Sequence, residues 1–549
     1  MSGLTTTDIS ALTTADVAVI TTSQIVELTT TQAPFLTTRF VSALGTDKIT
    51  ALEPADLALL TDAAFATFSS AQIVALTTEQ IMALTTSQVT LIKTNVLASL
   101  STQQVVGFNT AQISSLRSTA IQALSTAQIA ALETRDVAVL TGTNLAAMSS
   151  EQLQALTSAQ IAGLTSSQVA GLSSSRLQLL TSSQISAIEA SDLAVLNSSQ
   201  LLSLSADQLK SLNASQIAGL TSTQILSLTS SILQGMSAAQ VAAIENTDLA
   251  LLSSGSLNLW STEQLQALTS SQIASLTSAQ LAGLSTTKLR SLTSSQIEGL
   301  STAQASNLSS VTLSNLTSSQ IKALETADVA VLKTTSLAAL NSSQIRALSN
   351  EQLVSLTTTQ LAGLTTKTLS SLSTAQLAIL SSTQMANLTS RAITAFSTLQ
   401  IASLTTLQVS SLSSTSVQAL SAAQLAAMET ADLAVLSSTN LAALSSAQLK
   451  GLTTTQVSGL STTALSQVST GALAGLNSAQ MASLTTTQVA GLTSAAVRAL
   501  GTTQLAAMET ADVAVLNSTN LAALSSVQVQ ALTTAQIVGL TDTQITNMN

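Results

Sequence analysis

Seven pairs of acidic side chains are the residues of this sequence best placed to do chemistry. Side chains three apart on a helix lie on one face, and paired carboxylates with other oxygen atoms suit Ca²⁺. The alternative is structural: acids in a first helical turn interact favourably with the helix dipole and keep the chain soluble. We therefore predict as candidate Ca²⁺ ligands the pairs Glu53/Asp56, Glu133/Asp136, Glu189/Asp192, Glu245/Asp248, Glu325/Asp328, Glu429/Asp432 and Glu509/Asp512.

Most other chemistry is excluded by residue type. The chain has no His and no Cys, so Ser-His and Cys-His catalysis, disulfides and the common zinc sites are all ruled out. Ser319 and Lys322 match the S-x-x-K spacing of a serine–lysine nucleophile, but serine is so abundant that chance explains the match. We expect no enzymatic activity, and Ca²⁺ is the one candidate cofactor.

An eight-residue repeat positions all of these side chains. Its pattern, L-[TS]-[ST]-x-Q-[ILV]-x-[AGS], is clearest in Leu156–Gly219, and we number its positions one to eight from the leucine. From Leu4 to Asn547 the register holds over 544 residues, or 68 octads, without insertion or deletion. Positions one and six are apolar throughout. Such strictness is typical of a stack in which each unit contacts its neighbours.

The octad predicts one short helix per repeat. A continuous helix fails because eight residues turn through about 800°, so the apolar stripe would not stay on one face. Positions one and six also have opposite parity, which a simple strand does not accommodate. Thr or Ser at position two with Gln at position five forms a capping box, and positions six and one then share a face. A β-solenoid is the alternative, since Thr, Ile and Val favour strands.

The spacing of the acidic octads bears on the size of one coil. The gaps are 10, 7, 7, 10, 13 and 10 octads, each one more than a multiple of three. If three octads made one coil, successive acidic octads would step around its three sides. Segmental duplication explains the same numbers, since the sequence from Ser421 closely matches that from Gly501.

The first 110 residues are the least regular part. Pro34, Pro54 and five of the six phenylalanines lie there, and terminal repeats usually deviate from the consensus. We predict residues 1–110 as a less regular N-terminal part, a candidate partial cap, continuous with a regular solenoid over residues 111–549. The C-terminal octad ends in register, and we expect it to abut another molecule or to mark a cut from a longer array.

Charge and hydropathy restrict the partners. The net charge is −10, which argues against binding to nucleic acid, since that needs a clustered basic face. No apolar run approaches the length of a membrane span, and the N-terminus lacks the basic and apolar regions of a Sec signal. We expect an extracellular or cell-surface protein that is exported without a cleaved Sec signal.

The tandem LTTxQI motif resembles a known class of arrays. LTTTQVAGL (484–492) and LTTAQIVGL (532–540) are similar to the octapeptide arrays of large bacterial surface or secreted proteins, often labelled adhesion or haem-utilisation proteins. The resemblance covers essentially the whole chain. A haem role lacks support here, because there is no His, Cys or Tyr to serve as an axial ligand.

Two functions from different classes follow. The first is a non-enzymatic structural protein, a rigid rod, stalk or self-assembling filament outside a bacterial cell, whose partner is another copy of itself, end to end or side by side. The second is an adhesin-type binding module that recognises carbohydrate, a surface or Ca²⁺ through the repeated acidic octads.

Overall fold

The computed structural model describes residues 1–548, and its regular secondary structure consists of short helices. Its 67 α-helices all begin at position three of an octad, from α1 (Thr6–Ala11) to α67 (Asp542–Thr546), and are four to six residues long. One octad departs from the rule and holds a 3-10 helix, η1 (Ala33–Phe35), instead. No strand occurs in residues 1–548. The predicted all-α solenoid is confirmed, and the β-solenoid alternative is wrong for these residues.

Most helices are bounded as the capping box predicts. In α15 (Thr126–Ala131), the Ser125 hydroxyl accepts from the Gln128 amide N–H at 3.2 Å, and Gln128 Oε1 accepts from the Ser125 amide N–H at 2.7 Å. The helix ends because Leu132, at position one, has extended backbone (ψ 140°), and its N–H donates to the carbonyl of Ile129. After a six-residue helix such as α15, two extended residues therefore separate the helix from the next.

The core is a narrow row of aliphatic side chains from positions six and one. Ile129 and Leu132 are both buried, as are their counterparts in nearly every octad. Two buried aliphatic residues contribute only about 4 kcal/mol, which is less than the entropy lost on ordering eight residues. Octads must therefore be stabilised by their neighbours in adjacent coils.

Helices pack against their third neighbours along the chain. Helix α40 (Thr326–Val331) packs against α37 (Thr302–Ser306) and α43 (Asn350–Ser355), its third neighbours in each direction. The position-five glutamines instead reach back 28 and 31 residues, to the carboxyl end of the fourth helix before them. Packing between third neighbours agrees with a coil of about three octads, and the glutamine tethers reach beyond it to the end of the helix before. Segmental duplication also explains the spacing of the acidic octads.

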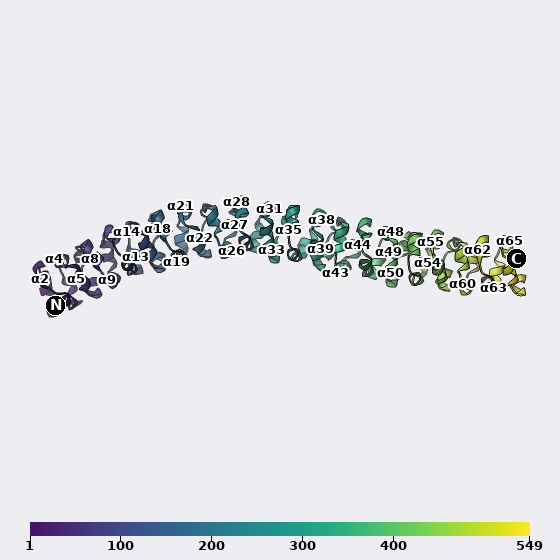
Figure 1. Cartoon of the computed structure of the whole chain (residues 1–549), viewed down its shortest axis with the longest axis horizontal. Helices are drawn as coiled ribbons and strands as arrows, with labels where there is room; N and C mark the ends of the chain where they lie inside the picture. Colours follow the sequence, from purple (N-terminus) through teal and green to yellow (C-terminus); the bar gives the residue numbers. More distant parts are fainter. Residues whose placement is uncertain (549) are drawn as a thin grey trace. The chain divides into compact units, whose positions relative to one another are not determined.

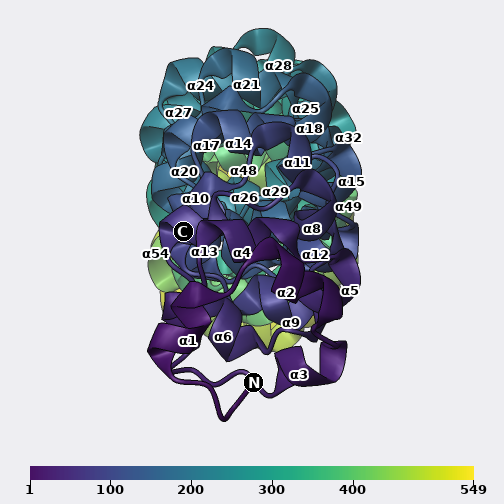
Figure 2. The ribbon, with the colours of Figure 1, turned by 90° about the vertical axis from the view of Figure 1, so that its left-hand side faces the viewer.

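Two compact units contain this coil, Met1–Leu268 and the residues from Thr269 onward. Within each unit the helices follow one another in chain order (Figure 1). Figure 2 views the first unit from its N-terminal side, with its earliest helices in front. The 3-10 helix η1 falls in residues 1–110, where irregularity was expected, but a structural division between 1–110 and 111–549 stays a prediction.

Small residues at position eight let adjacent coils approach closely. No residue in 1–548 has a positive φ, so no glycine there serves a left-handed turn. Gly491, which follows α60 (Thr486–Ala490), instead lies against α57 (Thr462–Gln467): a Cβ at Gly491 would overlap Cγ2 of Thr462. Gly471 in α58 (Thr470–Leu473) faces open space, with no atom within 4 Å of such a Cβ.

These two glycines should respond to alanine in opposite directions. We expect Gly491→Ala to destabilise its coil by about 2 kcal/mol through overpacking, and Gly471→Ala to stabilise its helix by up to about 1 kcal/mol. Amide hydrogen exchange on each variant measures the change. Adding Thr462→Ser removes the overlapping methyl group and should restore most of the loss; an uncorrected loss would mean that the contact is not the cause.

Candidate functional site

Position five, which falls on residue numbers divisible by eight, is the chemically distinctive place in the octad. Its usual occupant is a buried glutamine. In Gln128 the side-chain oxygen caps its own helix, while Nε2 donates to the carbonyls of Leu97 at 2.9 Å and Leu100 at 2.7 Å. The slot thus needs an acceptor toward its own helix and a donor toward the preceding coil.

Other side chains in this slot also donate to the preceding coil. Asn440 donates to the Leu412 carbonyl at 2.9 Å, and Ser336 donates to the Leu308 carbonyl at 2.7 Å. Arg176 Nη1 donates to the Met148 carbonyl at 2.7 Å. In each case the acceptor lies 28 residues earlier, at position one. Several kinds of donor in this slot therefore tether neighbouring coils, whereas Thr312 and Thr368 bond the hydroxyl of their own N-cap residue.

The acidic octads place an aspartate in the slot and a glutamate at the N-cap. All seven aspartates, Asp56, Asp136, Asp192, Asp248, Asp328, Asp432 and Asp512, are at most 4 % exposed. Six of the seven N-cap glutamates are exposed and Glu133 is half-buried. In residues 1–548, neither side-chain oxygen of Asp56, Asp136 or Asp328 has a hydrogen-bond partner. An ionised carboxylate has no proton to donate, so these octads lack the tether.

Burial shifts the titration of these carboxyls. It raises the pKa of Asp56 and of Asp328 to about 6, and the nearby charges of Glu53 and Glu325 add to the rise. Burial likewise raises the pKa of the three aspartates Asp136, Asp432 and Asp512. Removal from water disfavours the charged form of a carboxyl, so the slot favours a neutral aspartic acid.

Two aspartates at position five that are not buried behave differently: Asp8 is exposed and Asp16 is half-buried. Asp8 and Asp16 accept hydrogen bonds from the backbone and hydroxyl of Thr5 and Thr13, which lowers the pKa of both carboxyls. The same residue at the same octad position is thus an ordinary capping acid when it is not buried. The difference comes from burial and from the replacement of the N-cap threonine by glutamate.

The residue 26 positions before each buried aspartate decides whether its carboxyl has a hydroxyl partner. Ser166 donates to Asp192 Oδ1 and Ser222 donates to Asp248 Oδ1, both at 2.6 Å. The other five aspartates have a threonine there, and in residues 1–548 none of these threonines makes the bond: Thr30, Thr110, Thr302, Thr406 and Thr486. Two serine-type and five threonine-type aspartates therefore coexist in one chain.

Comparison with known proteins identifies the repeat. A family described as the ALTTAQ repeat matches nine segments, which together cover well over half of the chain: residues 49–86, 129–166, 185–222, 241–278, 274–310, 321–358, 356–390, 425–462 and 505–542. The chain belongs to the ALTTAQ repeat family. No curated protein matches it. The predicted resemblance to LTTxQI octapeptide arrays is confirmed at the level of the repeat.

The acidic octads have a fixed place in the ALTTAQ matches. Seven of the nine matched segments begin four residues before the glutamate of an acidic octad, as at residue 49 before Glu53 and residue 321 before Glu325. The acidic octad therefore recurs at one phase of the repeat pattern. None of the helices in the described ALTTAQ array is long and apolar enough to cross a membrane.

The structure separates the two members of each predicted Ca²⁺ pair. The N-cap glutamate lies at the surface or near it while its aspartate, one turn on, is buried. No group of three or more acidic side chains that could hold a metal occurs within residues 1–548. Ca²⁺ binding stays a prediction.

The Ser319 and Lys322 side chains are both exposed on α39 (Ser318–Ala323), and no hydrogen bond joins them in the described residues.

Each acidic octad of the ALTTAQ array also exposes a bulky aliphatic side chain, which the sequence reasoning missed. Position eight, elsewhere mostly Ala, Gly or Ser, holds Leu59, Val139, Val195, Leu251, Val331, Val435 and Val515, all at least 36 % exposed. The signal was readable as E-x-x-D-[LV]-A-[VL]. Acid and aliphatic residues thus vary together in these octads.

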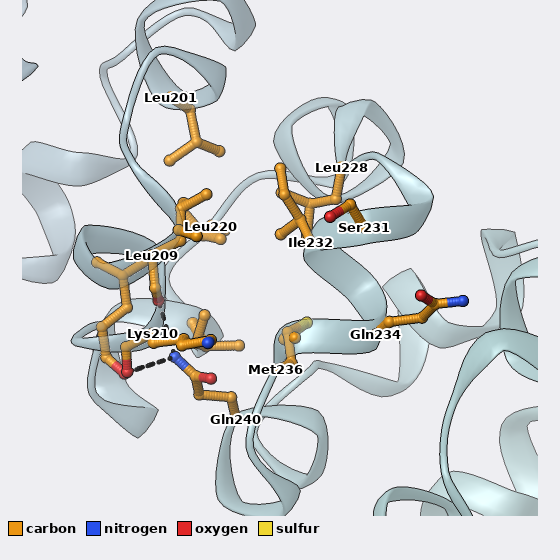
Figure 3. A pocket seen from close by; sticks show the side chains of 14 residues that line it. Leu201, Leu209, Lys210, Leu220, Leu228, Ser231, Ile232, Gln234, Met236 and Gln240 are labelled. Carbon is orange, nitrogen blue, oxygen red and sulfur yellow. Dashed lines mark hydrogen bonds between the residues drawn. The ribbon is translucent and has the colours of Figure 1, made fainter.

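Several octads have an apolar residue in the slot, and beside one of them, Ile232, lies a cavity of about 330 Å³. Ile232 of α28 (Ser230–Gly235) occupies position five and is half-buried. Figure 3 shows Ile232 and Leu228 on one side of the cavity and Leu209 and Leu220 on the other. Isoleucine cannot make the glutamine tether, so this coil is incompletely filled.

Restoring the tether should stabilise this coil. In the Ile232→Gln variant the new amide would reach the carbonyls of Leu201 and Leu204, 31 and 28 residues earlier. We expect a gain of about 1 kcal/mol, measured by hydrogen exchange of the amides in α28. Ile232→Ala is the control, because it removes apolar surface without adding a donor. Equal stability of the two variants would contradict the tether.

Proposed function

We propose that this ALTTAQ-repeat protein is a non-enzymatic structural element, a rigid rod, stalk or self-assembling filament outside a bacterial cell. The observation that carries the proposal is the glutamine tether. Coil after coil is joined to its predecessor by buried hydrogen bonds of the kind made by Gln128 and Gln320. Such repetition suits continuity and stiffness, because each coil is stabilised by its neighbours.

The surface supports the same proposal. Hydroxyl side chains dominate positions two and three, and only 8 % of the residues are charged. A weakly charged, repetitive surface offers the same chemistry to neighbouring copies at every octad, so the partner that fits it is another copy of the chain, end to end or side by side.

Electron microscopy of the purified protein is the direct test. We expect rods of uniform length or filaments built from them, whereas compact particles would contradict the proposal. Fractionation of the bacterium that produces the protein tests the extracellular location: recovery only from the cytoplasm would exclude it.

The second candidate function is an adhesin-type binding module for carbohydrate, a surface or Ca²⁺. It is favoured by the acidic octads, each of which presents an N-cap glutamate and an exposed aliphatic side chain, as in Glu325 and Val331. Calorimetry with Ca²⁺ on the wild type and on a variant with all seven glutamates changed to Gln separates the two candidates. Absence of wild-type binding would remove the Ca²⁺ version.

A further inference from the structure

The position-five slot holds several kinds of hydrogen-bond donor. Gln, Asn, Ser and Arg differ in size and charge, yet side chains of each type donate to the carbonyl 28 residues earlier. Aspartate can make this bond only as the neutral acid. A buried polar group without a partner costs about 1–3 kcal/mol, and a charged group costs more. The slot therefore favours the protonated form of the aspartate carboxyl.

Asp328 shows the arrangement most clearly. By the register of the tethers it lies opposite the carbonyls of Ile297 and Leu300. It is 0 % exposed, and neither of its oxygens has a partner in residues 1–548. Its helix, α40, packs against α37 and α43. The slot thus holds a carboxyl group, and the acceptors that face it come from the preceding coil.

We propose that the five threonine-type aspartates are proton-dependent tethers between coils. As a neutral acid, each donates its hydrogen to the position-one carbonyl of the preceding coil. On ionisation that proton passes to solvent, the hydrogen bond is lost and a charge is left buried. The five are Asp56, Asp136, Asp328, Asp432 and Asp512.

The surroundings of Asp328 supply no compensating charge. The charged groups on the elements around it are all exposed: Glu298 from the preceding coil, Lys322, Glu325 and Lys333 from its own coil, and Glu351 from the following one. The chain has no His. After burial, which raises the pKa of Asp328, the largest effects come from Glu325: its charge raises this pKa, and the approach of its backbone N–H lowers it.

The two serine-type aspartates are natural controls. In Asp192 and Asp248 the carboxyl oxygen Oδ1 already accepts a hydrogen bond from the hydroxyl of Ser166 or Ser222, which the threonine-type aspartates lack. A change of one residue, Thr302→Ser, should convert Asp328 from the threonine type to the serine type.

The sign of the pH effect follows from linkage. The pKa of Asp328 is about 6 in the folded coil and 3.8 in water, so the closed coil binds more protons than the opened one between these values. The equilibrium constant for closing the coil is largest below about pH 4 and falls about tenfold per pH unit up to about pH 6. Above pH 6 both states are ionised and the dependence ends.

Hydrogen exchange on the full chain tests this. We expect the protection of amides 297–303 and 325–332, taken relative to the Asp328→Asn variant at each pH, to fall about 100-fold between pH 4 and pH 7.5. The comparison with the variant removes the intrinsic pH dependence of exchange. Asparagine already fills this slot at Asn144, Asn440 and Asn520, so the variant should fold and remain tethered at every pH.

Three outcomes decide the matter. The proposal would be overturned if the ratio of amide protection in the wild type to that in Asp328→Asn did not change with pH. It would also be overturned if Na⁺, K⁺ or Ca²⁺ restored protection at pH 7.5, since a cation would then be the tether. Loss of the pH dependence in Thr302→Ser would support it. None of these results depends on whether the protein forms rods, so a failure here is distinct from a failure of the structural function.

Discussion

Replacing Gln128 by glutamate is expected to open its coil more than any other single change of comparable size. The substitution keeps the length and shape of the side chain and the oxygen that caps Ser125. It replaces the amide group that donates to the carbonyls of Leu97 and Leu100 with a carboxylate oxygen. This oxygen would face two carbonyl oxygens and could donate to neither. Gln128 is 2 % exposed, so the new charge would also be buried.

We expect Gln128→Glu to cost about 3 kcal/mol at pH 7, which corresponds to exchange about a hundredfold faster in the amides of α15. Hydrogen exchange is the suitable measurement, because long repeat arrays do not unfold in a two-state manner. The loss should shrink as the pH falls, since a protonated carboxyl regains one donor.

Gln122 provides the matched control in the next helix back, α14 (Ser118–Ala123). Its side chain is exposed and donates to the Ala147 carbonyl at 2.8 Å. Gln122→Glu introduces the same charge at the surface and should change stability by less than about 0.5 kcal/mol. Equal effects at the two positions would show that the buried tether is not what matters.

The sequence alone was sufficient for the local structure. Ser125 and Gln128 predict a capping box, and the spacing of Ile129 and Leu132 predicts one apolar face; both hold. These features depend on residues within one octad. Helix type, helix start and core positions could therefore be read before any coordinates were known.

The relation between coils could not be derived in the same way. Whether Gln128 Nε2 meets a carbonyl 24, 28 or 31 residues earlier depends on the angle between successive helices, and that angle is set by the two extended residues at positions one and two. The octad pattern contains no information on this angle. Three octads per coil was therefore one option raised by the spacing of the acidic octads, and the reach of the glutamine tethers to the fourth helix before them could not be predicted.

The burial of Asp328 was missed for the same reason. On an isolated helix, position five is a first-turn acid that can face solvent, as Asp8 and Asp16 do. Only the preceding coil turns it into a buried slot. The Glu–Asp spacing therefore suggested a surface cation site, although Asp328 lies inside the stack and Glu325 lies on its surface.

If the register of tethers is the rule of construction, removing one whole octad should be tolerated. Deleting residues 357–364, which contain α44 (Thr358–Ala362), joins Leu356 to Thr365 and preserves the order of positions. Gln384 now donates to the carbonyls of Leu353 and Leu356. After the deletion it would meet Ile345 and Leu348, which stand at the same octad positions. We expect unchanged helical circular dichroism and a thermal midpoint within about 3 °C of the wild type.

Deleting only residues 357–360 removes half as much chain and should do far more damage. Gln384 would then face Ser349 and Gln352, and the apolar residues after the cut would fall at polar positions. The chain can recover its register only by giving up the remaining half octad as a loop, which breaks the coil at that point. We expect exchange protection to be lost across the coils on both sides of the cut. Similar protection in the two deletions would mean that the loops absorb register errors, and the tethers would then follow the fold rather than determine it.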